Sequence, residues 1–257
     1  MAKLVDRRRA LTAVAASLSA LPLAGCDLFS QNPDVLKVLD SAEALTLQAQ
    51  RLLLSRQSLA QEFPKADISK DFKANGTTNP DTPAYTALAQ SGFKNWQLEV
   101  GGLVDHPLHL SLADLRALPS RTQITRHDCV EGWSCIGQWT GAPLSTVLKQ
   151  ASLKPDAKYI VFHCADSLDE MNPSNKYYES IDLVDAFHPQ TILAYDMNGA
   201  PLGVPYGAPL RVRVERQLGY KMAKYIMRIE AVSDLKKIYS GNGGYWEDQG
   251  YEWYAGV

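Results

Sequence analysis

Residues 126–134 read Arg-His-Asp-Cys-Val-Glu-Gly-Trp-Ser, with Cys129 set between charged neighbours and ahead of a Gly-Trp pair. A thiol in such polar surroundings is a poor core residue, whereas a thiolate is a good soft ligand for a transition metal. A second stretch, Trp-Thr-Gly-Ala-Pro-Leu at 139–144, follows closely. The sequence therefore predicts a metal site organised around Cys129.

The two stretches resemble segments of the sulfite oxidase family of molybdenum enzymes, in which a Cys-Val-Glu-x-Trp-Ser segment supplies the one protein thiolate on molybdenum. Blocks at Lys158–Phe162, Leu193–Gly199 and Gly207–Arg211 resemble that family in the same order, so the resemblance covers roughly residues 96–232. It implies an α+β domain with a mixed, partly barrel-like sheet. It also implies a molybdenum-molybdopterin cofactor (Mo-MPT) with Cys129 as the metal ligand, held as thiolate by the metal.

The resemblance also places basic residues on the cofactor, whose terminal phosphate needs cationic partners. Arg211 matches the arginine that binds this phosphate in the family, and Lys221 and Lys224 match a lysine-containing stretch that contacts the cofactor. On a strand, Arg211 and Arg213 face the same way. For Arg213 we expect a solvated charged side chain instead of a cofactor contact.

Three further cofactor contacts are implied at positions that depart from the family or match it loosely. Asn75, in an Asn-Gly pair, is the counterpart of a pterin-binding asparagine, although Asn-Gly is also an ordinary turn dipeptide. Cys164 stands where the family has a pterin-contacting threonine, and Tyr206 replaces an asparagine. For Cys135 we expect burial, not approach to the substrate.

The cysteines allow other uses. His127, Cys129, Cys135, His163 and Cys164 could supply zinc ligands, but no close Cys-x-x-Cys pair occurs, and His163 and Cys164 lie on a predicted strand where neighbours face opposite sides. A disulfide-bonded or buried Cys129 is the other alternative. A Cys-x-x-Cys-His haem motif and the cysteine set of an iron–sulfur cluster are also missing from the sequence.

Near Cys129, Arg126 and His127 are the predicted catalytic partners. Oxidation of an anion such as sulfite would need several cations there, and Asp128 and Glu131 offset the two basic groups. The sequence thus predicts oxygen-atom or two-electron transfer on a small substrate, and leaves the substrate and the direction of the reaction open. The competing function is a non-catalytic lipoprotein, a binding or assembly module that keeps the fold.

The first residues read as an export signal, which we assign to 1–25. Three arginines, Arg7 to Arg9, precede an uncharged stretch that is shorter than the roughly 20 apolar residues of a membrane span. The paired arginines resemble a twin-arginine signal, the route that carries folded, cofactor-loaded proteins. Leu23–Cys26 resembles a lipobox with Cys26 as the lipidated residue, and Asp27 favours retention on the inner membrane; an ordinary cleavage site is the alternative.

These features predict an enzyme on the periplasmic face of the bacterial inner membrane, held by its lipid anchor. Because the chain offers no second redox centre, electrons must be exchanged with a separate subunit, which by analogy with the family we expect to be a membrane cytochrome b or quinone-linked protein. Removal of 1–25 would move the formal charge from −2 to −5. An acidic protein argues against nucleic acid as a partner.

The chain is organised around one domain, since 46% hydrophobic residues over 257 positions suffice for a buried core. We expect a helix over Asp34–Arg56 and a long loop over Phe63–Gly92 within residues 26–92, the molybdopterin-binding domain at 93–235, and an aromatic tail at 236–257. Predicted strands are 96–100 with a short second strand after it, 159–162, 191–195, 210–214 and 225–232. Predicted helices are 112–118, 143–151 and 182–187, with turns at 198–199 and 218–220.

Overall fold

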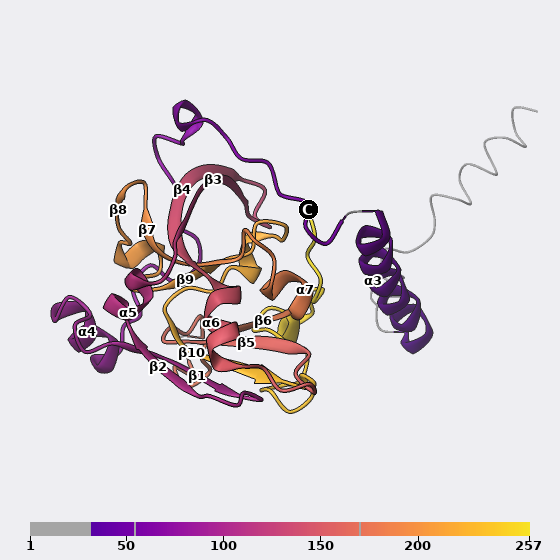
Figure 1. Ribbon diagram of the computed structural model, residues 1–257. Coiled ribbons are helices and arrows are strands. Elements are labelled where there is room, and N and C mark those ends of the chain that lie inside the picture. The colour runs from indigo at the N-terminus through magenta and orange to yellow at the C-terminus, as the bar shows by residue number, and fades with distance from the viewer. Residues whose placement is uncertain (1–31, 54, 170) are drawn as a thin grey trace, which may run out of the picture. The chain divides into compact units, whose positions relative to one another are not determined.

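The computed structural model describes residues 32–53, 55–169 and 171–257, and it divides into two units, Met1–Gln50 and Arg51–Val257 (Figure 1). The predicted export signal and the lipidation site at Cys26 lie outside the described residues. Among the described residues, no helix is long and apolar enough to cross a membrane. The cofactor and catalytic residues predicted from the sequence all belong to the second unit.

Helix α3, Pro33–Leu53, corresponds to the helix predicted over Asp34–Arg56. Asp34 lies in its first turn and Arg51 in its last, where each charge complements the helix dipole. The prediction was wrong at the C-terminal end, because Arg56 lies in a turn. There the Ser58 N–H donates to the Ser55 carbonyl (3.0 Å) and the Gln57 N–H to the Ser55 hydroxyl, which competes with helical bonding.

Two five-stranded sheets form the domain (Figure 1). The first has the order β2-β1-β10-β5-β6 and is mixed, because β1 and β10 run parallel while the other pairs are antiparallel. The second has the order β3-β4-β7-β8, with β9 also paired to β7, and all its pairs are antiparallel. The strands are β1 Gln97–Gly102, β2 Leu108–Ser111, β3 Arg121–Asp128, β4 Ser134–Pro143, β5 Tyr159–Cys164, β6 Tyr178–Asp182, β7 Ile192–Met197, β8 Ala200–Pro201, β9 Arg211–Arg213 and β10 Ile226–Val232.

Short helices connect the strands, and the three predicted in the domain are confirmed. They are α5 Leu112–Ala117, α6 Leu144–Ala151 and α7 Leu183–Ala186, together with α4 Pro83–Gln90 and the 3-10 turns η1 Lys65–Asp67, η2 Val204–Tyr206, η3 Gly219–Lys221 and η4 Glu247–Gln249. The predicted turns are also present, since Asn198-Gly199 joins β7 to β8 with positive φ at both residues and η3 separates β9 from β10.

The long loop predicted over Phe63–Gly92 was wrong at its end, which forms α4. Thr82 caps this helix by accepting a hydrogen bond from the Tyr85 N–H (3.3 Å), and Pro83 occupies its first turn. Residues that read as loop formers are thus the start signal of a helix. Tyr85 is buried and its hydroxyl donates to the Ala208 carbonyl (2.6 Å), which fixes α4 on the domain.

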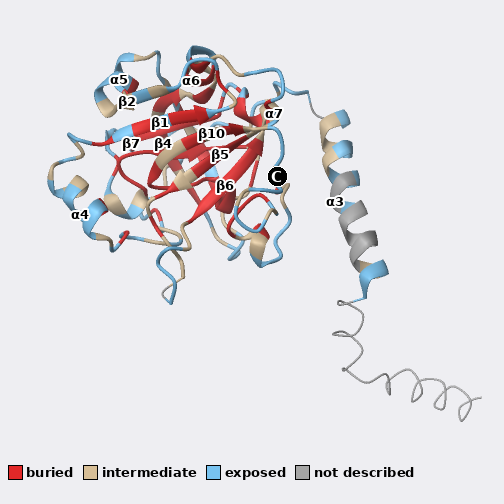
Figure 2. Cartoon of the chain, turned by 90° about the horizontal axis from the view of Figure 1, so that it is seen from below, coloured by how far each residue is buried: buried red, intermediate tan, exposed pale blue. Residues whose placement is uncertain are grey.

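Strands β3, β4 and β6 were not predicted. In β3 the side chains that face inward are Gln123, Thr125 and His127, so the strand has no alternation of apolar and polar residues although it is half-buried. Buried residues concentrate along strands β1, β4, β5, β6 and β10 (Figure 2). The expected α+β domain with a mixed, curled sheet is confirmed.

The segment after β10 returns onto the domain. The Tyr245 N–H donates to the Tyr178 carbonyl (3.0 Å) and the Leu218 N–H to the Ala255 carbonyl (2.9 Å). Trp253 donates its indole N–H to the Ser180 hydroxyl (2.8 Å). Residues far from the strands in sequence therefore complete the wall of the domain.

Candidate active site

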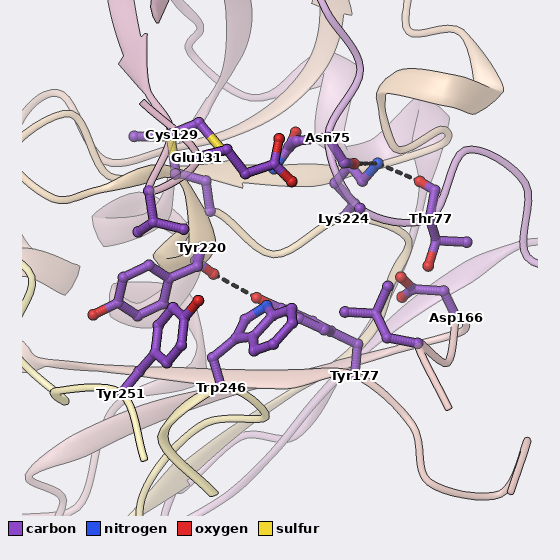
Figure 3. Close-up of a pocket in the computed structure, with 15 residues that line it drawn as sticks. Asn75, Thr77, Cys129, Glu131, Asp166, Tyr177, Tyr220, Lys224, Trp246 and Tyr251 are labelled. Carbon is purple, nitrogen blue, oxygen red and sulfur yellow. Dashed lines mark hydrogen bonds between the residues drawn. The ribbon is translucent and has the colours of Figure 1, made fainter. Parts of the chain in front are cut away.

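A cavity enclosing about 680 Å³ of space, part of it open to solvent, lies between four parts of the domain (Figure 3). Its wall is built from the loop 75–77, the turn Cys129–Glu131 after β3, residues of the connection between β5 and β6, and η3 with Lys224. Two aromatic residues of the C-terminal segment, Trp246 and Tyr251, close it from another side. The cavity brings together three predicted site residues, Cys129, Asn75 and Lys224.

Cys129 begins the turn that reverses the chain between β3 and β4. Its N–H donates to the Trp133 carbonyl (2.9 Å), and the Gly132 N–H donates to the Cys129 carbonyl (3.0 Å). Gly132 has φ +82°, a conformation that favours glycine. Burial raises the pKa of the Cys129 thiol, so without a metal this group is the protonated thiol.

Two buried cations lie near Asn75 and Tyr206. The Lys224 ammonium donates to the carbonyls of Asn75 (2.6 Å), Pro205 (3.2 Å) and Thr77. The Arg211 guanidinium donates to the Tyr206 (3.1 Å) and Met222 (3.3 Å) carbonyls. Burial lowers the pKa of Lys224 to about 7 and that of Arg211 to about 9.

This pair of cations fits an anionic group. Among the described residues, neither Lys224 nor Arg211 has a carboxylate within ion-pair distance, and the buried Nε of Arg211 has no hydrogen-bond partner. Gly207, with φ +106°, lets the two side chains approach, since a Cβ there would lie 2.8 Å from the Lys224 Cβ. The carboxylates of Asp166 and Glu215 act on these charges from beyond ion-pair distance and offset only part of the cost of burying them. A phosphate would offset the rest. The residues present therefore fit the phosphate end of molybdopterin.

His127 is fully buried beside the cavity. The Arg213 Nη1 lies 3.0 Å from its Nδ1, and because a guanidinium can only donate, Nδ1 must accept and the neutral ring carries its proton on Nε2. Burial and the positive charges of Arg213, Arg211 and Lys224 lower the pKa of His127 well below its usual range. Nε2 has no partner among the described residues, and a Cβ on the cavity-lining Gly219 would lie 2.4 Å from it.

Arg213 corrects the expectation of a solvated side chain. It is fully buried, and its guanidinium forms two hydrogen bonds to Glu215 (2.9 and 2.7 Å) while lying 4.4 Å from the Trp139 ring centroid. Gln123 donates to the same carboxylate (2.8 Å). The face of β9 that carries the charges is covered by side chains from β3 and β4, which the local sequence does not reveal.

Arg211, His127 and the remaining predicted site residues lie outside the cavity lining. The Lys221 ammonium donates to two buried carboxylates, Glu179 and Glu247. Arg126 is exposed and pairs with Asp128 (2.8 Å). The Tyr206 hydroxyl donates to the Phe72 carbonyl (3.0 Å).

The other two thiols of the described chain, Cys135 and Cys164, are buried. Burial of Cys135, as predicted, is confirmed. Burial also raises the pKa of Cys164 well above its usual range. Within the described residues no group of three or more His, Cys, Asp or Glu side chains is arranged to hold a metal ion, and His163 is paired with Glu230 (2.9 Å).

Several cavity residues were missed by the sequence reasoning. Asp166 is 3% exposed and lines the cavity, and burial raises its pKa to about 6. Tyr177 and Tyr220 line it as well, and the Tyr177 hydroxyl donates to the Tyr220 carbonyl (2.6 Å). For two further lining residues, Trp246 and Tyr251, the density of aromatic residues in the C-terminal tail was a local signal.

Comparison with known proteins identifies the family of the chain. The family model described as "Oxidoreductase molybdopterin binding domain" matches residues 85–239. The "Putative protein-methionine-sulfoxide reductase subunit YedZ1" of Azospira oryzae is 39% identical over 204 residues, 79% of this chain and 70% of that protein. The "Protein-methionine-sulfoxide reductase catalytic subunit MsrP" of Xanthomonas axonopodis pv. citri is 33% identical over 242 residues, 90% of this chain and 71% of that protein.

Among solved structures, the sulfane dehydrogenase SoxCD from Paracoccus pantotrophus aligns with a TM-score of 0.49 and 23% identity, over 55% of this chain and 39% of that one. The family match includes Cys129, Arg211 and Lys224. It confirms the predicted sulfite oxidase family and the molybdopterin cofactor. The chain belongs to the family of oxidoreductase molybdopterin-binding domains and is a molybdopterin-dependent oxidoreductase.

Proposed function

We propose that this chain is the catalytic subunit of a protein-methionine-sulfoxide reductase, with Cys129 as the protein ligand of molybdenum. The names of the two relatives support the substrate. The observation that carries the proposal is the position of Cys129 on the wall of a cavity that also holds Lys224. When bound, molybdopterin supplies oxygen-atom transfer coupled to two electrons; a sulfoxide then takes up two electrons and two protons and yields a thioether and water.

The chain's own residues would hold the cofactor and direct a proton-bearing group toward it. Arg211 and Lys224 bind the phosphate, and Asn75 contributes to the same end of the cavity, since its carbonyl holds the Lys224 ammonium. Arg213 fixes the tautomer of His127, so that the Nε2–H is available as a donor beside Gly219.

The other predicted residues take less direct roles in this proposal. Cys164 and Tyr206 shape the surroundings of the cofactor. Lys221 holds neighbouring elements together, because its ammonium is already bound by two carboxylates. Arg126, exposed near the turn that carries Cys129, is placed to meet a substrate arriving from solvent.

A neutral sulfoxide fits this site better than an anion such as sulfite. The buried cations Arg211 and Lys224 are engaged by backbone carbonyls beside Asn75 and Tyr206. Beside Cys129 the cavity wall carries the Glu131 carboxylate, which is exposed and paired with Lys73 (3.4 Å), so this end of the cavity offers an anionic substrate no net positive charge. The charges therefore favour cofactor phosphate at one end and an uncharged substrate at the other.

The test is a pair of cysteine variants made in cells that synthesise molybdopterin. Cys129→Ser should fold, because the volume change is small. Its rate of sulfoxide reduction should fall at least about 100-fold, because replacing the metal ligand itself should cost at least as much as replacing a residue that only supports a ligand. Cys135→Ser should keep molybdenum and activity. Metal analysis, pterin analysis and reduction of methionine sulfoxide measure this; a fully active Cys129→Ser enzyme would overturn the proposal.

We infer that the protein is exported folded by the twin-arginine route and lipidated at Cys26, on the periplasmic face of the inner membrane. The Arg7-Arg8 pair and the Leu23–Cys26 segment support this. Replacement of both arginines by lysine should leave cofactor-loaded precursor in the cytoplasm, and Cys26→Ala should abolish acylation. Normal export of the lysine variant would contradict the route, and an unacylated mature terminus would contradict the anchor.

Electrons would come from a separate membrane haem-b or quinone-linked subunit. Lipidation would confine the enzyme to the membrane surface and raise its effective concentration near such a partner. Adding methionine sulfoxide to reduced membranes should reoxidise haem b only when the enzyme is present, which is seen as the loss of the absorbance bands of reduced haem b. Equally efficient turnover of the purified enzyme with a soluble nicotinamide would rule out a dedicated membrane partner.

A further inference from the structure

Three aromatic side chains, Tyr220, Trp246 and Tyr251, form a continuous wall of the cavity, here called the aromatic wall. The Trp246 and Tyr251 rings stack with centroids 5.1 Å apart, and Tyr251 meets Tyr220 edge-on at 5.4 Å. Figure 3 shows these rings across the cavity from Cys129 and Glu131. Trp246 and Tyr251 lie beyond residue 239, where the family match ends.

The aromatic wall is held in place without a substrate. The Tyr220 hydroxyl donates to the Glu252 carbonyl (2.7 Å), and the Tyr251 N–H donates to the Trp246 carbonyl (3.0 Å). Lys221 follows Tyr220 in the chain and Glu247 follows Trp246, and these two residues form a buried ion pair. Binding of a ligand to the wall therefore costs little conformational entropy, because the side chains of the wall are already held in place.

The wall borders the open side of the cavity. Tyr251 is 40% exposed, and Val130, on the opposite turn beside Cys129, is 43% exposed. A side chain presented by another polypeptide could therefore enter between them. The apolar faces of the rings suit a group that is apolar along its length and carries one polar end.

The side chain of methionine sulfoxide has this character, with two methylenes and a methyl around one S=O dipole. Sulfur and methyl groups are stabilised at aromatic rings. We propose that the aromatic wall is the specificity-determining surface that binds the methionine-sulfoxide side chain, with its apolar part on Tyr251 and Trp246 and its S=O toward Cys129. This proposal rests on the reductase function proposed above and deepens it.

The experiment compares two substrates of the molybdopterin-loaded enzyme with a reduced dye as electron donor: N-acetylmethionine sulfoxide and dimethyl sulfoxide. Tyr251→Ala should raise KM for N-acetylmethionine sulfoxide about fivefold to tenfold, the effect of losing part of the burial of its two methylenes, with kcat within about twofold. KM for dimethyl sulfoxide, which lacks the methylenes, should change less than about twofold. Tyr251→Phe keeps the ring and should behave like the parent.

Phe187→Ala is the matched control, because Phe187 is similarly exposed (39%) and lines a different cavity. Trp246→Leu is the second variant, and cofactor content and Tm show that each variant is folded. If the parent enzyme reduces neither sulfoxide, the proposed function and the wall both fail. If it reduces both and neither Tyr251→Ala nor Trp246→Leu raises KM for N-acetylmethionine sulfoxide, the wall alone is wrong.

Discussion

Lys224 shows at the scale of one residue how the fold prepares a site for an anion. Its ammonium is buried, and backbone carbonyls are its hydrogen-bond acceptors within the described chain. Burial, and then the neighbouring Arg211, lower its pKa from 10.5 to about 7. Between these two pH values the unfolded chain binds more protons than the folded chain, so stability must rise with pH over that window.

Lys224→Met should remove this dependence. Without cofactor, the parent's free energy of unfolding should increase relative to that of the variant by roughly 3 to 5 kcal/mol between pH 7 and pH 10.5, because each unit of pKa shift corresponds to about 1.4 kcal/mol. Below pH 7 the cost of the buried ammonium is fully present in the parent. Urea unfolding of both proteins across this range measures the difference.

The same measurement on loaded protein provides the control. A bound phosphate favours the charged ammonium and raises the pKa of Lys224 again, so the difference in slope between parent and variant should shrink. A slope that is identical with and without molybdopterin would show that Lys224 does not meet the phosphate.

At the scale of one element, η3 carries three functions in three residues. Gly219 leaves room for the His127 ring, Tyr220 belongs to the aromatic wall, and Lys221 binds the carboxylates of Glu179 from β6 and Glu247 from η4. Lys221 and both carboxylates are buried. Burial and the nearby Glu247 charge raise the pKa of Glu179 well above its usual range. The Lys221 ammonium therefore offsets the free-energy cost of burying the two carboxyl groups close together.

Lys221→Ala should lower the free energy of unfolding by about 3 to 5 kcal/mol at neutral pH, because removing one partner leaves buried acidic groups uncompensated. Lys154→Ala, at an exposed lysine, should change it by less than about 0.5 kcal/mol. Urea unfolding of cofactor-free protein measures both. Equal stability of the two variants would mean that the carboxylates find other partners.

At the scale of the whole molecule, the domain is closed by residues that follow its last strand. Tyr245, Glu247 and Ala255 are buried, and the segment is tied to β6 and to the connection between β9 and β10 by hydrogen bonds. The unit Arg51–Val257 is thus larger than the matched family region 85–239 at both ends.

A chain that ends at residue 239 should fail to fold cooperatively, whereas a chain that begins at Arg51 should keep the parent's Tm and its ability to load molybdopterin. Each large apolar side chain lost from the C-terminal segment costs about 1.5 to 3 kcal/mol, and together these approach the usual stability of about 5 to 15 kcal/mol. Calorimetry and pterin content after expression in the cytoplasm decide this. A stable domain ending at 239 would contradict it.

The sequence by itself determined the family, the cofactor and most of the strands. Cys129 could be found because the turn that presents it is a contiguous motif. Strands β5 and β10 could be found because local runs of apolar residues indicate that they are buried. The α+β class follows from the order of such runs.

Only the tertiary structure decided which charged groups are buried and what they meet. Arg213 looked solvated because its partners Glu215, Gln123 and Trp139 come together only when β3, β4 and β9 pack. Lys221 reads in sequence like Lys224, yet one meets two carboxylates and the other backbone carbonyls. Local patterns record the chemistry of a side chain, whereas its environment depends on segments that are distant in the chain.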